Sequence, residues 1–153
     1  MLGTRRTQTS VDIPVAAGSR PVMLVTFDVP FEREATELAV DAAVESGQRL
    51  IIVNAVEITL GPLTLSMYQY VGSPDVEDAL RAPAELARSL AVDVERLRLC
   101  SPRPVEALLE LVAERVPGLL VVGPDRARLK RRKYARLAKS IRERAPCLVW
   151  LPS

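Results

Sequence analysis

The residues best suited to chemistry lie between Val121 and Leu151, where an apolar run ends at Gly123 and a strongly basic segment follows. A glycine after a strand lets backbone N–H groups approach phosphate oxygens closely, in conformations that a Cβ atom disfavours. Arginine guanidinium groups bind the same oxygens through side-chain forks. Gly123 and the arginines of this segment, Arg126 and Arg136 among them, are therefore candidate anion-binding residues.

Several kinds of catalytic site are excluded by composition. The 153 residues include no histidine, which removes Ser-His-Asp and Cys-His catalysis, histidine bases and histidine-containing zinc sites. The acidic clusters Glu32 to Glu37 and Asp75 to Asp78 lie at predicted helix beginnings, where carboxylates favour the helix dipole. No paired acid and base, activated nucleophile or metal cluster is evident. We therefore expect a non-enzymatic protein without metal or cofactor, with ATP as the alternative.

The overall composition fits one intracellular domain. The formal net charge of +2 is too small to imply nucleic-acid binding by the whole protein. Cys100 and Cys147 lie far apart without a CxxC motif, which favours reduced, packed thiols. No apolar run approaches the ~18 residues of a membrane span, and no signal-peptide core follows the first residues. We expect a soluble cytoplasmic protein that does not contact a membrane.

Five apolar runs predict strands, separated by four stretches of helical periodicity. Short continuous runs rich in β-branched residues are typical of strands covered on both faces, and apolar spacings of three and four residues predict amphipathic helices. The predicted strands are Pro21–Asp28, Arg49–Val56, Val92–Leu99, Leu119–Val122 and Cys147–Leu151. The helical stripes are Ala35–Ser46, Val76–Leu90, Val105–Ala113 and Tyr134–Ile141. Gly47 should end the first helix, Pro83 should open or kink the second, and the alternating third strand should lie at a border.

This strict alternation predicts an α/β fold, a single-domain five-stranded mostly parallel sheet with helices on both faces. Ligands in such sheets bind outside the carboxyl ends of the strands, at the point where strand order reverses. If the first and fourth strands flank that point, Asp28 and Gly123 face one crevice, and Val56 joins it at the end of the second strand. Residues 21–153 are predicted to form the domain and residues 1–20 a flexible arm.

Taken in order, these features resemble the universal stress protein family. They comprise the first strand, the helix ended by Gly47, a long second connection, Gly123 and the Ala145-Pro146-Cys147 turn into the last strand. The resemblance implies a fold of the adenine nucleotide alpha hydrolase-like type. It also implies a homodimer paired through its last strand, here Cys147–Leu151. One branch of the family binds ATP and another does not.

The ATP-binding branch carries an acidic residue after its first strand and a phosphate loop of Gly, two residues, Gly, nine residues, Gly and then Ser or Thr. Asp28 matches the acid and Gly123 the first glycine, but Arg126 stands at the second glycine. The final pair falls on Arg136-Leu137, or on Ala135-Arg136 with a one-residue deletion. Because arginines would crowd the nest of amides, we expect the usual Mg-ATP geometry to be lost.

Three functions stay open at this point. The first is a binding or regulatory protein that does not bind ATP in the family manner, and the second is an ATP-binding or weakly ATP-hydrolysing member with a rearranged arginine-rich loop. The third is a basic module that docks anionic partners, because ten cations and two acids lie between Asp125 and Arg144. A phosphorylated small molecule fits that segment, whereas nucleic acid is not expected without interleaved aromatic residues. A solvated helix face is the plain alternative.

The connection Glu57–Asp75 is too apolar for a disordered loop. We expect it to form a flap over the crevice, a dimer contact or a small hairpin around Gly61-Pro62.

Overall fold

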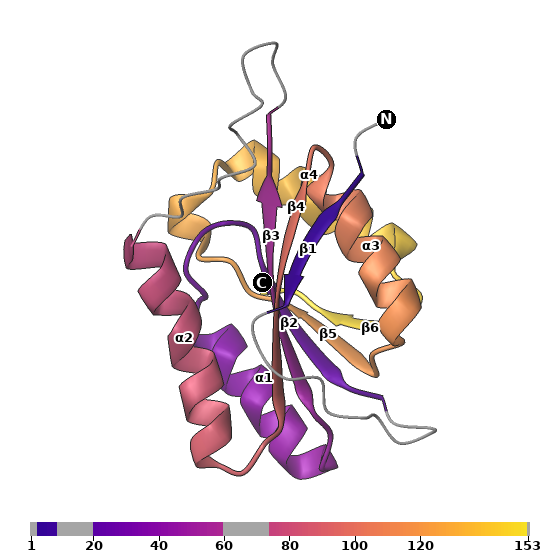
Figure 1. Ribbon diagram of the computed structural model, residues 1–153. Coiled ribbons are helices and arrows are strands. Elements are labelled where there is room, and N and C mark those ends of the chain that lie inside the picture. The colour runs from indigo at the N-terminus through magenta and orange to yellow at the C-terminus, as the bar shows by residue number, and fades with distance from the viewer. Residues whose placement is uncertain (1–2, 9–19, 60–73, 153) are drawn as a thin grey trace.

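The computed structural model describes residues 3–8, 20–59 and 74–152, and it confirms the predicted α/β architecture (Figure 1). The strands are β1 (Arg5–Gln8), β2 (Val22–Thr26), β3 (Leu50–Glu57), β4 (Val94–Ser101), β5 (Leu119–Val122) and β6 (Leu148–Trp150). The helices are α1 (Arg33–Ser46), α2 (Pro74–Ser89), α3 (Pro104–Arg115) and α4 (Arg131–Arg144), with a 3-10 turn, η1 (Arg126–Arg128), before the last.

The strands form one sheet in the order β1-β4-β3-β2-β5-β6. β2 pairs in parallel with both β3 and β5, and Val25 lies between Val53 and Val122. From β2 the chain adds β3 and β4 on one side and β5 and β6 on the other, so strand order reverses between β2 and β5. The first and fourth predicted strands are therefore neighbours, as a shared crevice requires.

A sixth strand, β1, lies within the range that we expected to be a flexible arm. Arg5–Gln8 pairs antiparallel with β4, and Arg6 lies opposite Leu99. The outer edge of β4 offers unpaired backbone groups, and β1 satisfies them. β4 is therefore the last parallel strand on its side of the sheet, and the prediction that it lies at the border is wrong because β1 covers its outer edge. The rest of the arm, residues 9–19, lies outside the described residues, as do residues 60–73 of the apolar connection.

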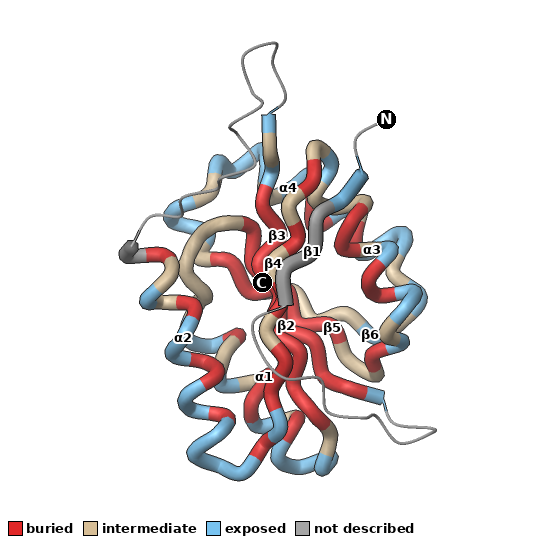
Figure 2. The backbone as a smooth tube through the Cα atoms, in the orientation of Figure 1, coloured by how far each residue is buried: buried red, intermediate tan, exposed pale blue. Residues whose placement is uncertain are grey.

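Each face of the sheet has its own apolar core, because successive side chains of a strand point to opposite faces. On one face, Met23 packs with Leu108 of α3 and Ile141 of α4. On the other face, Leu24 packs with side chains of α1 and α2 that include Ala39. Figure 2 shows the buried residues concentrated in the central strands and along the inward sides of the helices. Covering on both faces accounts for the continuous apolar runs in the sequence.

The helix ends follow local sequence signals. Gly47 adopts a positive φ of 67° after α1, and its N–H is directed at the carbonyl groups of Ala43 and Val44. Pro104 begins α3, where a missing N–H costs least. Pro83 lies inside α2 rather than at its beginning. None of the described helices is long and apolar enough to cross a membrane.

Candidate functional site at the carboxyl edge of the sheet

The loops that follow β2 and β5 meet at the point where strand order reverses. Phe31 and Pro124 form an antiparallel bridge. The backbone N–H of Glu32 donates to the Gly123 carbonyl at 2.8 Å, and the N–H of Asp125 donates to the Pro30 carbonyl at 2.8 Å. Backbone hydrogen bonds therefore fasten the two loops together over the reversal point.

Gly123 is buried beneath α1. An added Cβ atom would lie 2.5 Å from the Cβ of Ala35 and 3.2 Å from Cδ1 of Leu24. Its backbone N–H donates to the Val25 carbonyl at 2.9 Å. A glycine is required here because the helix approaches so closely, and its amide is already engaged by the neighbouring strand.

Arg126 is held by Glu32. Oε1 of Glu32 lies 2.8 Å from Nε of Arg126 and also accepts the Arg126 backbone N–H at 3.3 Å. This hydrogen bond raises the pKa of the Arg126 guanidinium, which is charged at any physiological pH. In the same loop, Oδ1 of Asp125 accepts the N–H of Ala127 at 3.0 Å. Two carboxylates of the protein thus bind consecutive backbone amides just after Gly123.

Glu32 precedes α1 as its N-cap residue, but its side chain makes no capping hydrogen bond. Its side chain is mostly shielded, with 18% of its area exposed, whereas that of Arg126 is 39% exposed. Sequence analysis assigned this acid to a helix beginning. Glu32 does lie at the beginning of α1, and its side chain also joins the loop after β2 to the loop after β5.

Asp28 occupies a conformation unusual for a residue with a side chain. Its φ is 59°, and its backbone N–H donates to Oδ1 of Asn54 on β3 at 2.8 Å. Aspartate tolerates this left-handed region better than most residues, and the Asn54 amide fixes the turn from the neighbouring strand. The end of β2 is thereby anchored to the end of β3.

The Asp28 side chain lines a cavity of about 220 Å³ on the α3 and α4 face of the sheet. Glu57 contributes a second carboxylate, and Lys133 of α4 contributes a cation whose Nζ lies 3.7 Å from Oε2 of Glu57. The described residues that line it are Phe27, Asp28, Ala55, Glu57, Thr59, Pro104 and Lys133. This cavity combines an apolar floor with groups that can both donate and accept hydrogen bonds.

The five predicted crevice residues do not all line this cavity. Asp28 lines the cavity, whereas Gly123 and Arg126 belong to the fastened loops. Val56 is buried in β3, and its sequence neighbours, rather than its own side chain, line the cavity. Arg136 is exposed on α4 and forms no ion pair with a described residue. Of the five residues, Asp28 alone lines this cavity, and a shared ligand site for all five stays a prediction.

Sequence analysis missed Glu57 and Lys133. Glu57 is the last residue of β3, so it shares the carboxyl edge with Asp28, and this position could have been recognised. Lys133 was counted only as one member of the basic segment. Its place depends on how α4 crosses the sheet, which the helical period does not specify.

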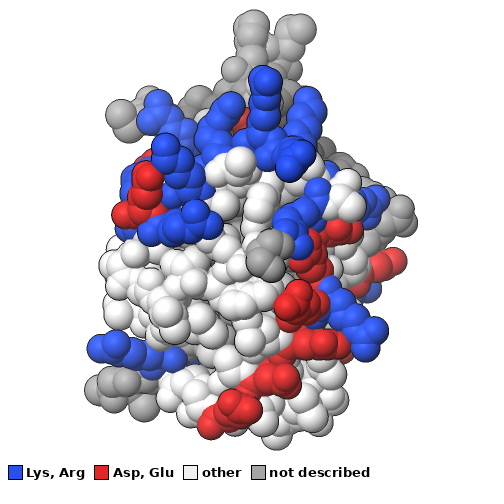
Figure 3. Space-filling model, turned by 180° about the vertical axis from the view of Figure 1, so that it is seen from behind, with Lys and Arg blue, Asp and Glu red and all other residues white. Residues whose placement is uncertain are grey.

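The basic segment forms a surface rather than a pocket. Figure 3 shows Lys and Arg side chains gathered at one end of the molecule, while most Asp and Glu side chains of that view form a separate band. The exposed cations of α4 are Arg131, Arg132, Lys133, Arg136, Lys139, Arg142 and Arg144. Over the described residues, no cluster of three or more potential metal ligands occurs.

The elements form an α/β fold whose strand order reverses between β2 and β5. The model of the universal stress protein family matches residues 19–151. The chain therefore belongs to the universal stress protein family, as its sequence features indicated.

Solved structures of the same family share the fold. A universal stress protein in complex with cAMP is 22% identical, with a TM-score of 0.59 over 88% of this chain and 96% of that chain. A family member from Burkholderia pseudomallei is 17% identical, with a TM-score of 0.65 over 91% and 100% of the two chains. A family member from Arabidopsis thaliana with AMP bound is 16% identical, with a TM-score of 0.56 over 86% and 89%. No curated protein sequence matches significantly.

Proposed function

We propose that this chain is a non-enzymatic binding or regulatory member of its family that does not bind Mg-ATP through the loop after β5. The observation that carries the proposal is the pairing of Glu32 with both the backbone N–H and the guanidinium of Arg126. Asp125 engages the next amide at Ala127 in the same way. These are the donors that a phosphate would need, and carboxylates of the protein already accept from them.

A triphosphate entering this loop would have to displace Glu32. The displaced carboxylate would then lie close to the incoming anion, so repulsion would add to the lost hydrogen bonds. At Gly123 the amide is bound to Val25, and Ala35 packs closely against the backbone. Both effects disfavour phosphate binding at this loop.

A nucleotide in a different position is the alternative function, and the cavity beside Asp28 favours it. Its volume of about 220 Å³ lies at the carboxyl edge of the sheet, where ligands of open α/β sheets bind. Two family structures hold cAMP and AMP, which carry one phosphate rather than three. A mononucleotide could use Asp28, Glu57 and Lys133 without entering the fastened loops.

Calorimetric titration with Mg-ATP, AMP and cAMP tests these functions. We expect no saturable heat from Mg-ATP with the natural protein, and weak binding to emerge in Glu32→Gln, which removes the competing charge. The matched control is Glu45→Gln, an exposed carboxylate near the other end of α1, which should behave like the natural protein. Saturable Mg-ATP binding to the natural protein would contradict the proposal. Binding of AMP that is lost in Asp28→Gly would support the alternative.

We further propose a homodimer paired through β6. Among the described strands, β6 has a neighbour on one side only, and Leu148 at its beginning is 70% exposed. Edge strands with exposed apolar side chains are suited to pairing across a two-fold axis. Light scattering should give a dimer for the natural protein and a monomer for Leu148→Lys. Val44→Lys, at an exposed apolar residue of α1, should leave the dimer intact, and a monomeric natural protein would contradict the proposal.

A further inference from the structure

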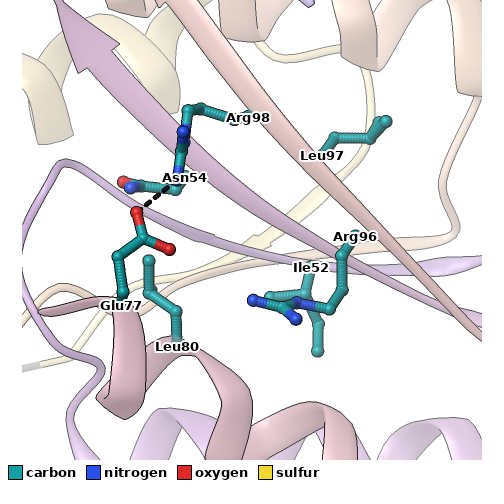
Figure 4. Close-up of a pocket in the computed structure, with 7 residues that line it drawn as sticks. All are labelled: Ile52, Asn54, Glu77, Leu80, Arg96, Leu97 and Arg98. Atoms are coloured by element: carbon teal, nitrogen blue, oxygen red, sulfur yellow. Dashed lines mark hydrogen bonds and ion pairs between the residues drawn. The ribbon is translucent and has the colours of Figure 1, made fainter. Parts of the chain in front are cut away.

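A second, smaller cavity lies on the opposite face of the sheet, between β3, β4 and α2. Its volume is about 40 Å³, and it is lined by Ile52, Asn54, Glu77, Leu80, Arg96, Leu97 and Arg98 (Figure 4). The strand register places Arg96 beside Ile52 and Arg98 beside Asn54. The cavity thus joins polar side chains of two neighbouring strands beneath a helix.

The amide of Asn54 supplies a hydrogen-bond donor to this cavity. Its Oδ1 accepts the backbone N–H of Asp28, which fixes the orientation of the amide, because a flipped Nδ2 would face another donor. Asn54 is only 5% exposed, so its Nδ2 is shielded from water, and Nδ2 has no hydrogen-bond partner among the described residues. A buried donor without an acceptor costs free energy, so an acceptor in the cavity would stabilise the protein.

The charges that line the cavity favour a negatively charged acceptor. Arg98 forms an ion pair with Glu77, as Figure 4 shows, so these two side chains neutralise one another. Arg96 adds a further positive charge, so the described lining holds two arginines and one carboxylate. Burial lowers the pKa of Arg96, the positive charge of Arg88 acts in the same direction, and the negative charge of Glu77 opposes them. An anion near Arg96 would offset both effects.

We propose that this cavity binds the carboxylate group of a small monoanion, with Asn54 Nδ2 and the Arg96 guanidinium as donors. A volume of roughly 10–15 Å³ on this measure holds one water molecule, so 40 Å³ accommodates about three water-sized groups. Three such groups correspond to the carbon and two oxygens of a carboxylate. Guanidinium groups bind carboxylates through paired hydrogen bonds, and a single negative charge balances the lining.

The site is independent of the function proposed above. It lies on the α1 and α2 face, whereas the cavity beside Asp28 faces α3 and α4. Asn54 links the two sites, because its Oδ1 accepts the Asp28 backbone N–H while its side chain lines the smaller cavity.

Titration with sodium formate at constant ionic strength, with chloride as the balancing anion, tests the proposal. The side-chain NH₂ resonances of Asn54 in the natural protein should shift saturably with formate. In Arg96→Gln, formate affinity should fall about ten-fold or more, the usual effect of losing one charged hydrogen bond. The control Arg81→Gln removes an exposed cation of α2 that does not line the cavity, and it should change affinity by less than about two-fold.

Three results would overturn the proposal. The first is that the Asn54 side-chain resonances do not change with formate. The second is that chloride alone shifts them saturably to the same extent. The third is that Arg96→Gln and Arg81→Gln lower the formate affinity equally. If Arg96→Gln does not fold, the Asn54 resonances of the natural protein still decide between formate and chloride.

Discussion

Glu32 Oε1 lies 2.8 Å from Nε of Arg126, and 94 residues separate the two in the sequence. The same oxygen accepts the Arg126 backbone N–H. One carboxylate thus joins the loop after β2 to the loop after β5 and occupies donors suited to a bound anion. This contact explains how an arginine can stand at a glycine position of the family's loop without leaving its amide unsatisfied.

Glu32→Gln should lower the free energy of unfolding by only about 0.5–1 kcal/mol, because the ion pair is partly exposed and water screens it. The loss should shrink at high salt. Urea denaturation at low and high salt measures both effects. A loss of several kcal/mol, unchanged by salt, would show that Glu32 acts through packing rather than charge.

Gly123→Ala should destabilise the fold by about 1–3 kcal/mol, because the new methyl group would meet the Ala35 side chain of α1. Gly3→Ala is the matched control, since no atom lies within 4 Å of the added Cβ atom there. Chemical denaturation of both variants gives their free energies of unfolding. The comparison separates the steric effect at Gly123 from the effect that any glycine-to-alanine substitution has on the unfolded chain. Equal stability of Gly123→Ala and the natural protein would mean that α1 can move away from β5.

Glu95 is a buried carboxylate between two arginines, and its removal should be costly. It is 0% exposed, with Arg49 Nη2 2.5 Å from Oε2 and Arg115 Nη2 2.7 Å from Oε1. Glu95→Gln would leave two cations without this charge, for a loss of about 3–5 kcal/mol. Thermal or urea unfolding measures the loss, with the half-exposed Glu114→Gln as control. A loss below about 1 kcal/mol would contradict this account.

Cys147 should react slowly with alkylating reagents at neutral pH. Burial raises the pKa of its thiol, because a thiolate loses solvation there. The half-maximal rate of iodoacetamide labelling at Cys147, followed by peptide mapping, should therefore occur at higher pH in the folded protein than in urea.

The sign of the linked stability change follows from the same shift. The unfolded chain releases the thiol proton at lower pH than the folded chain does, so this group lowers stability as pH rises above the ordinary thiol pKa. Identical labelling profiles in the folded and unfolded protein would contradict the assigned environment of Cys147.

The parallel sheet could be predicted because its central strands, β2, β3 and β5, are covered on both faces. Met23 and Leu24 face opposite cores, and this arrangement requires the continuous apolar runs that the sequence contains. Gly47 marked the end of α1 because its positive φ is a local requirement. Features fixed by local geometry or by burial were thus visible in the sequence.

Features fixed by contacts between distant residues were not visible. Arg5–Gln8 carries polar and basic residues without a strand pattern, and it pairs with β4 through backbone groups. Glu32 resembles any acid at a helix beginning until the loop after β5 is folded against it. Motif position does not say that Arg126 pairs with Glu32, or that Arg136 is exposed on α4 and does not line the cavity.

The central claim is that the loop after β5 does not bind Mg-ATP, because Glu32 and Asp125 occupy its amides. Its most direct test is the response of the Arg126 and Ala127 backbone amides to Mg-ATP, followed by ¹⁵N NMR on the natural protein. The account predicts that neither amide shifts saturably, because Glu32 and Asp125 already accept from them. Saturable shifts of both amides at the same Mg-ATP concentration would contradict it, since they would show that the phosphates displace the two carboxylates.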